Sequence, residues 1–379
     1  MRRRRPMYPA VSSGRRWARW ALWVVLAVLA SCGDSGAGPG VEAIVGALDD
    51  GVAGRWTTAS PQSMGVSPTV LGAMGDRIDA GHFGEISSLL VLRSGVLVYE
   101  RYWGEWDPDD LHRVYSVTKS VTSLALGIAD GEGRLAELDT PLLDLFPEYP
   151  SVAAAEGKDG IVLEHVLQMR TGLEWDELST NYDTGTNPTA SLIASDDWIE
   201  FVLDLPLDTL PGHEFVYNSG VSMLMSGVLE NEFGESAESY VARSLFDPLG
   251  IEEWVWSEGP GGLTNTGWGL RLEPRDMAAV GQLVLQEGTW DGVPIVPREW
   301  IARSGLPAST FEDGRGYGYQ WWLPSGPDRP MAGWGWGGQF VVVLPSIDLV
   351  VVSTAENYLG GGFDPYVLAD FGYEAVPGG

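Results

Sequence analysis

The sequence predicts an α+β fold in which an antiparallel sheet is flanked by helices and carries an inserted, mostly helical lobe. Residues 86–103 contain two β-rich runs separated by Ser94-Gly95, which is a hairpin signal. Residues 339–355 contain a second pair of β-rich runs, broken at residues 345–348. Between the two pairs, apolar residues recur at helical spacing. Two hairpins that lie far apart in a chain can share one sheet, so the segment between them becomes an insert.

The helical elements follow in chain order, and the helical lobe is expected to span roughly residues 117–265. Gly131, Gly172 and Gly234 stand where helices are expected to stop, because glycine readily adopts the left-handed conformation that ends many helices. The expected helices span residues 117–130, 163–170, 197–205, 220–233, 237–249 and 274–287.

The composition is that of an acidic globular protein. The chain has 23 basic and 52 acidic residues, giving a formal net charge of −29, and 44% of its residues are hydrophobic. Such a surface repels nucleic acid and anionic lipid, so no nucleic-acid partner is expected. We interpret the acidity as a solvated surface that keeps the protein soluble, and it carries no information about the substrate.

The N-terminus has the composition of an export signal. Two Arg-rich stretches precede the apolar run "WALWVVLAVLA". This run is shorter than the ~20 residues that cross a bilayer. The following "LASCG" resembles the lipobox of bacterial lipoproteins, in which the signal peptide is removed before a cysteine that is then lipidated. Cys32, the only cysteine of the chain, is therefore the expected lipid-attachment residue, and a reactive thiol is the alternative.

Three segments result: a lipoprotein signal peptide (1–31), a flexible glycine-rich tether (32–54) and a globular domain (55–379). We expect the domain to be exported and anchored by lipid at the cell envelope, on its periplasmic or extracellular face. The stretch "GRRWAR" makes a twin-Arg export signal the weaker alternative. The sequence sets neither the membrane nor the oligomeric state.

A possible nucleophile and its base stand at the start of the expected helix 117–130. Ser116 and Lys119 are three residues apart, so on a helix their side chains lie on one face. A serine hydroxyl needs a base to remove its proton, and a lysine whose pKa is depressed by burial and by the helix N-terminus can supply a neutral amine. Only two lysines occur in the chain, Lys119 and Lys158, which argues against Lys119 as an ordinary surface cation.

The stretch "SVTKSVTSLALGIADG" resembles the S-x-x-K motif of the serine β-lactamase and penicillin-binding-protein superfamily. The similarity extends from about residue 58 to about 365 and is strongest to the class C-like esterase branch that includes 6-aminohexanoate-oligomer hydrolases. It is carried further by "LLVLRSGVLVYERY", "VLEHVLQMRTGLEWDE", "FVYNSG", "YGYQWW" and "GWGGQF". The resemblance implies a β-lactamase-like fold and an acyl-enzyme mechanism that needs no metal or other cofactor.

The resemblance also implies a second catalytic motif, Tyr-x-Asn, whose tyrosine completes the proton relay. In "FVYNSG", Tyr217 occupies the tyrosine position and Ser219 takes the place of the asparagine. A phenol beside a lysine can pass a proton to a leaving group. A hydroxyl at position 219 can still hydrogen-bond Lys119, whereas the contact that the amide would make with substrate is lost.

The third motif of the superfamily, Lys/His-Thr-Gly, corresponds here to Trp336, Gly337 and Gly338. By resemblance, the backbone N–H of the next residue, Gln339, would join that of Ser116 in binding the oxyanion. The missing cation matters, because β-lactams and D-Ala-D-Ala peptides carry a carboxylate that this residue helps to hold. An aromatic-walled cleft is the expected replacement.

The sequence therefore predicts a serine hydrolase that cleaves a carboxylic ester or a small amide, with Ser116 as nucleophile and Lys119 and Tyr217 as proton relay. The alternatives are a β-lactamase or D-Ala-D-Ala carboxypeptidase with the same chemistry, and a non-catalytic envelope-binding protein on the same fold. No G-x-S-x-G nucleophile elbow and no H-E-x-x-H metal motif occurs in the chain.

Overall fold

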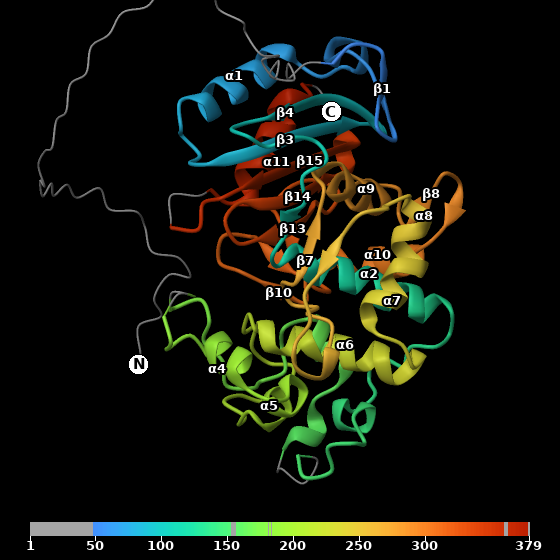
Figure 1. The fold of residues 1–379 in the computed structure, drawn as a ribbon, viewed down its shortest axis with the longest axis vertical. Helices are drawn as coiled ribbons and strands as arrows, with labels where there is room; N and C mark the ends of the chain where they lie inside the picture. Colours follow the sequence, from blue (N-terminus) through green and yellow to red (C-terminus); the bar gives the residue numbers. More distant parts are fainter. Residues whose placement is uncertain (1–47, 153–156, 181, 183, 360–362, 378–379) are drawn as a thin grey trace, which may run out of the picture.

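The computed structural model of the chain describes residues 48–152, 157–180, 182, 184–359 and 363–377 (Figure 1). The expected signal peptide, Cys32 and most of the tether lie outside the described residues, so those expectations stay predictions. A short strand, β1 (Gly51–Ala53), lies inside the segment 32–54 expected to be a flexible tether, so regular structure begins before residue 55. None of the described helices is both long enough and apolar enough to cross a membrane.

A ten-stranded sheet forms the centre of the molecule. Its strands are β1, β2 (Trp56–Thr58), β3 (Ile86–Arg93), β4 (Val96–Tyr102), β10 (Ser309–Thr310), β11 (Gly316–Tyr317), β12 (Trp322–Leu323), β13 (Met331–Gly335), β14 (Gln339–Leu344) and β15 (Leu349–Ala355). Their order is β1-β2-β4-β3-β15-β14-β13-β12-β11-β10, and the described pairs are antiparallel apart from β2 with β4. Because β3 pairs with β15, the two predicted hairpins are neighbours in one sheet, as expected.

Two small antiparallel sheets accompany the large one. They are formed by β5 (His112–Arg113), β7 (Leu270–Leu272) and β6 (Val255–Trp256), and by β8 (Thr289–Trp290) and β9 (Val293–Pro294). The first of them holds β5 a few residues before Ser116.

The six helices expected between the hairpins are found within a few residues of their expected positions, whereas α4 (Pro188–Ala194) and α10 (Arg298–Ser304) were not expected. The expected helix 237–249 is divided, because a π-helical segment over residues 242–246 separates α7 from α8. Gly234 ends α6 with a φ of 69°, as expected, whereas Gly131 is the last residue of α2 and Gly172 lies in a loop beyond α3. The helices are α1 (Pro68–Asp79), α2 (Val117–Gly131), α3 (Leu163–Leu167), α4 (Pro188–Ala194), α5 (Trp198–Asp204), α6 (Ser219–Phe233), α7 (Ala237–Val241), α8 (Asp247–Leu249), α9 (Pro274–Leu285), α10 (Arg298–Ser304) and α11 (Pro365–Ala375).

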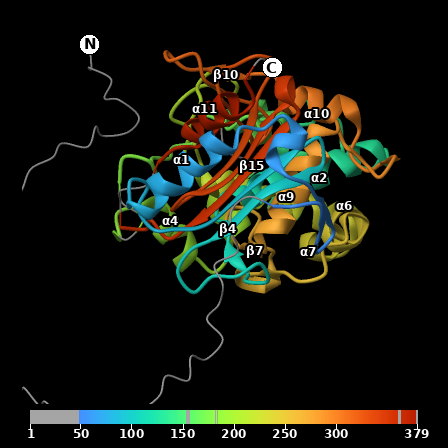
Figure 2. The same ribbon diagram turned by 90° about the horizontal axis from the view of Figure 1, so that it is seen from above.

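Helices cover both faces of the central strands (Figure 2). A Cβ atom added to Gly281 of α9 would lie 2.6 Å from Val350, and one added to Gly372 of α11 would lie 3.0 Å from the adjacent Leu349. Successive residues of a strand point to opposite faces, so α9 and α11 pack on opposite sides of β15. All seven residues of β15 are buried, which explains the almost uninterrupted apolar run in its sequence.

Helix α2 lies at the junction of the sheet and the helical lobe, and every residue from 117 to 129 is buried. Its buried hydroxyls are satisfied by neighbouring backbone. Ser120 donates to the carbonyl of Gln320 at 2.8 Å, and Ser123 donates to the carbonyl of Tyr319 at 2.8 Å. These bonds fix the rotation of α2 about its axis, because each buried hydroxyl would be costly to leave unpaired.

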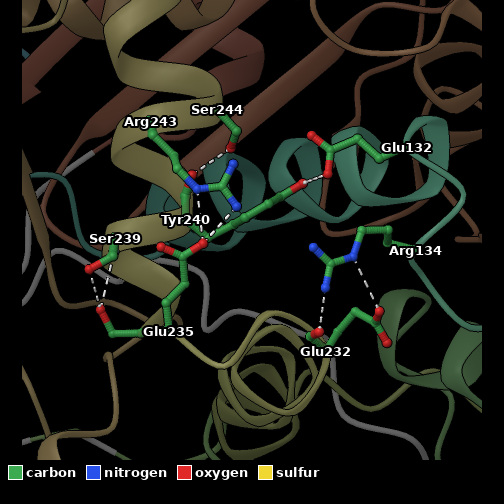
Figure 3. A network of polar contacts seen from close by, with 9 residues as sticks. Glu132, Arg134, Glu232, Glu235, Ser239, Tyr240, Arg243 and Ser244 are labelled. Atoms are coloured by element: carbon green, nitrogen blue, oxygen red, sulfur yellow. Dashed lines mark hydrogen bonds and ion pairs between the residues drawn. The ribbon is translucent and has the colours of Figure 1, made fainter.

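Polar contacts tie the C-terminal end of α2 to the helical lobe at the surface (Figure 3). Arg134 forms an ion pair with Glu232 of α6 at 3.4 Å, and the hydroxyl of Tyr240 in α7 donates to Glu132 at 3.4 Å. An exposed ion pair such as Arg134–Glu232 stabilises a protein by only about 0–1 kcal/mol. We therefore attribute the stability of this junction mainly to the apolar burial of α2.

Two helical glycines provide a matched test of this packing. A Cβ atom at Gly127 of α2 would lie 2.5 Å from the buried ring of Trp300, whereas one at Gly72 of α1 would meet nothing within 4 Å. We expect Gly127→Ala to destabilise the fold by about 1–3 kcal/mol through overpacking, and Gly72→Ala to stabilise it by up to about 1 kcal/mol through helix propensity. Urea denaturation measures both changes, and equal free energies of unfolding for the two variants would contradict the packing described for α2.

Candidate active site

Ser116 is the N-cap residue of α2 and follows a turn that the neighbouring strand approaches closely. Tyr115 has a φ of 46°, an uncommon conformation for an aromatic residue, and such backbone strain concentrates at functional sites. A Cβ atom at Gly335 of β13 would lie 2.2 Å from the carbonyl oxygen of Val114. The glycine therefore lets the strand run directly beside the turn that presents Ser116.

Lys119 points at Ser116, as the spacing predicts. Its Nζ lies 2.9 Å from Ser116 Oγ, 3.0 Å from Ser219 Oγ and 2.7 Å from the carbonyl oxygen of Gly267. The side chain is only 1% exposed. The amine is therefore held by three hydrogen-bond partners inside the protein rather than by water.

Burial sets the charge state of this amine. It lowers the pKa of Lys119 from 10.5 to about 8, because the charged form loses its hydration, while the carboxylate of Glu177 acts in the opposite direction. Near neutral pH the ammonium form still predominates, but an appreciable fraction of neutral amine is available. A lysine in this state can accept a proton from a neighbouring hydroxyl.

Tyr217 belongs to the same cluster. Its side chain is buried, and Lys119 Nζ lies 5.1 Å from the centroid of its ring. The ring stacks on Trp322 with the centroids 5.6 Å apart. The next residue, Asn218, caps α6 by accepting a hydrogen bond from Val221 N, so Tyr217 is fixed directly before a helix N-terminus. The structure thus brings Tyr217 beside Lys119, and its role in proton transfer stays a prediction.

One member of the site, Glu177, is not predicted from the sequence. This carboxylate is 1% exposed and accepts hydrogen bonds from both the backbone N–H (2.6 Å) and the hydroxyl (2.8 Å) of Ser219. It lies in "GLEWDE", one of the stretches that carry the family resemblance. Nothing in that stretch distinguishes Glu177 from its exposed acidic neighbours, because its burial results from contacts with α6, 42 residues away.

The strand connection 336–338 forms the opposite wall of the site. Gly337 and Gly338 have φ of 86° and 103°, values that favour glycine. Gln339 directly follows this connection and is not among the residues that line either cavity at Ser116, and the expectation that its backbone N–H binds the oxyanion stays a prediction. It is the first residue of β14, paired with Gly335, and its side chain donates to the carbonyl of Ala355.

Two cavities open at Ser116, and we name each after its walls. The tryptophan cavity has a volume of about 230 Å³ and is lined by Tyr217, Trp322, Trp334, Trp336, Gly337, Gly338 and Phe363 among others. The isoleucine cavity has a volume of about 210 Å³ and is lined by Tyr115, Thr189, Ile193, Ser219 and Trp268. Ser116, Tyr182 and Trp336 line both cavities. The rings of Tyr182 and Trp336 are 5.5 Å apart and form the partition between them.

Both cavities are uncharged and largely aromatic. None of the described residues that line them is acidic or basic. The described part of the chain also contains no group of three or more His, Cys, Asp or Glu side chains placed to hold a metal ion. The arrangement offers a nucleophile, a buried base and two apolar compartments, which suits attack on a carbonyl that joins two neutral groups.

Comparison with known proteins gives a consistent result. The Beta-lactamase family model matches residues 84–361. The chain is 25% identical over 295 residues to the 6-aminohexanoate-dimer hydrolase of Paenarthrobacter ureafaciens, covering 71% of this chain and 72% of the relative.

Solved structures show the same fold. A family VIII carboxylesterase superposes with a TM-score of 0.65 at 17% identity, covering 82% of this chain and 98% of the esterase. A penicillin-binding-protein homologue from Caulobacter crescentus gives a TM-score of 0.65 at 18% identity, covering 82% of this chain and 99% of the homologue. The predicted β-lactamase-like α+β architecture is therefore confirmed.

The charge state of Lys119 predicts how the reactivity of Ser116 depends on pH. We expect the rate of labelling by a neutral fluorophosphonate to rise through a midpoint near pH 8 and to level off above it, because the amine accepts the proton of Ser116 only after losing its own. Mass spectrometry of the labelled peptide measures the rate, with Ser116→Ala as the unlabelled control. A rate that is constant from pH 6 to 9, or labelling that persists in the control, would contradict this assignment.

Proposed function

We propose that this chain, which belongs to the Beta-lactamase family of serine hydrolases, cleaves a neutral carboxylic ester or small amide through an acyl-enzyme on Ser116. The observation that carries the proposal is the buried amine of Lys119, 2.9 Å from Ser116 Oγ, at the point where two uncharged cavities meet. A hydroxyl, a base and a water-poor carbonyl site are the parts that nucleophilic acyl transfer requires.

In the acylation step, neutral Lys119 accepts the proton of Ser116 while Oγ bonds to the substrate carbonyl carbon. The tetrahedral intermediate then collapses, the bond to the leaving group breaks, and the leaving alcohol or amine takes up a proton through Tyr217 and Lys119. In deacylation, water gives one proton back to the same pair and its oxygen attacks the acyl carbon. The acid is released and Ser116 regains its proton, so the net reaction consumes one water.

The developing oxyanion needs hydrogen-bond donors that are already in place. The backbone N–H of Ser116 at the start of α2 is one candidate, favoured by the partial positive charge of the helix N-terminus. The second candidate is the backbone N–H of Gln339, as the resemblance implies, since this residue directly follows the 336–338 connection that lines the tryptophan cavity beside Ser116. Each such donor contributes about 3–4 kcal/mol to transition-state stabilisation in comparable enzymes.

The two cavities suggest that the acyl group and the leaving group of a substrate bind in separate compartments. The acyl group and the leaving group must lie on opposite sides of the carbonyl carbon that Ser116 attacks, and the Tyr182–Trp336 partition separates two compartments at that point. Because both compartments are apolar, a carboxylate on either side would lose its hydration without gaining a charged partner. This speaks against the alternative of a β-lactamase or D-Ala-D-Ala carboxypeptidase, whose substrates carry a carboxylate.

A matched pair of esters tests the proposal. p-Nitrophenyl hexanoate and mono-p-nitrophenyl adipate differ only in a terminal methyl or carboxylate group, and we expect kcat/KM to be at least about tenfold higher for the hexanoate, a difference of about 1.4 kcal/mol. Trp336→Lys places a cation on the cavity wall and should narrow the difference. Ser116→Ala should abolish turnover of both esters.

Three outcomes would overturn the proposal: equal or faster turnover of the adipate, unchanged turnover by Ser116→Ala, or rapid hydrolysis of nitrocefin in the absence of esterase activity. The last result would favour the β-lactamase alternative. Absence of both turnover and fluorophosphonate labelling would favour a non-catalytic binding protein.

A further inference from the structure

We propose that Glu177 is a positioning residue that fixes the direction of the hydrogen bonds around Lys119, so that the lone pair of the neutral amine can face only Ser116. The inference rests on the proposed function, because it explains how the base of that reaction is aimed. It adds a residue outside the serine, lysine and tyrosine that the resemblance implies.

Four donors surround the Glu177 carboxylate. Oε2 accepts from the backbone N–H of Ser219 and from the indole N–H of Trp175, both at 2.6 Å. Oε1 accepts from the hydroxyl of Ser219 at 2.8 Å and from that of Tyr182 at 2.9 Å. A backbone N–H and an indole N–H can only donate, so Glu177 serves as the common acceptor of this group.

The orientation of Ser219 follows from that of Glu177. A serine hydroxyl has one hydrogen, and the hydroxyl of Ser219 commits it to Glu177 Oε1. Only the lone pairs of Ser219 Oγ therefore remain for Lys119, whose Nζ is 3.0 Å away. Lys119 must donate in this contact and cannot accept.

The remaining partners of Lys119 complete the argument. The carbonyl oxygen of Gly267, 2.7 Å from Nζ, is also purely an acceptor. A neutral amine has two hydrogens and one lone pair, and Ser219 and Gly267 take both hydrogens. The lone pair is then directed to the third partner, Ser116, which can donate its O–H at 2.9 Å. Proton transfer breaks the Ser116 Oγ–H bond, forms an N–H bond on Lys119 and leaves the other two hydrogen bonds unchanged.

Glu177 also adjusts the charge of the amine, in a direction opposite to burial. Its negative charge raises the pKa of Lys119, which burial lowers. The other titratable side chains at this point are phenols: the ring of Tyr217 faces Lys119, Tyr182 donates to Glu177, and the pKa of buried Tyr317 is raised far above its usual value by burial and by Glu177. Glu177 is thus the acidic group that acts on Lys119.

Glu177→Gln tests both the orientation of the hydrogen bonds around Lys119 and the effect of the Glu177 charge on its pKa, with p-nitrophenyl hexanoate as the substrate. The amide nitrogen can donate to Ser219 Oγ, which turns the Ser219 hydrogen towards Lys119 and misdirects the lone pair, so we expect kcat to fall at least about tenfold with little change in KM. The midpoint of the pH profile of kcat/KM should move to lower pH, because a negative charge near the ammonium is lost. Glu177→Asp keeps the charge, so its midpoint should stay near that of the parent protein.

Two further variants separate this role from a merely structural one. Glu100 is an equally buried carboxylate that pairs with Arg275 and is not among the residues lining either cavity, so Glu100→Gln should not move the midpoint. Ser219→Ala removes the link between Glu177 and Lys119 and should lower kcat without shifting the midpoint of the pH profile. This variant keeps the test valid if Glu177→Gln fails to fold.

Inactivity of the parent protein would count against the proposed function. An active parent whose Ser219→Ala variant keeps its kcat, or whose Glu177→Gln variant keeps both kcat and midpoint, would overturn the role of Glu177.

Discussion

The burial of one lysine amine beside a serine hydroxyl is the constraint on which the rest of the site depends. An ammonium taken out of water costs several kcal/mol unless other groups replace its hydration, and the pKa of Lys119 falls for this reason. The protein supplies three hydrogen-bond partners for its Nζ, no more than a lysine amine can use. The arrangement keeps the amine buried without a direct carboxylate partner, so the neutral form remains within reach near physiological pH.

These partners come from separate parts of the fold, which explains why α2 must be held firmly between them. Ser219 begins α6 in the helical lobe, Gly267 precedes β7, and Ser116 stands beside the sheet at β13. The buried hydroxyls of Ser120 and Ser123 fasten α2 to the segment before β12. A rotation of α2 would therefore break the contacts of Lys119 and those of its neighbours together.

Local patterns in the sequence predicted much of this arrangement. The two hairpins and the helical pattern between them predicted that both hairpins share one sheet, which the pairing of β3 with β15 confirms. Three-residue spacing on a helix was sufficient to bring Ser116 and Lys119 together. Glu177 was missed because its burial depends on α6, and no local pattern singles out one acidic side chain among 52. The oxyanion role of Gln339 stays a prediction: the residue begins β14, directly after the 336–338 connection that lines the tryptophan cavity.

The chain has only two lysines, which allows the charge of Lys119 to be measured directly. Lysine labelled with ¹³C at Cε gives one NMR signal per residue, and Lys158→Arg leaves Lys119 alone in the spectrum. We expect this signal to titrate with a midpoint near pH 8 in the folded protein. A midpoint at or above 10.5, the ordinary value for lysine, would show that the amine stays charged and cannot be the base for Ser116.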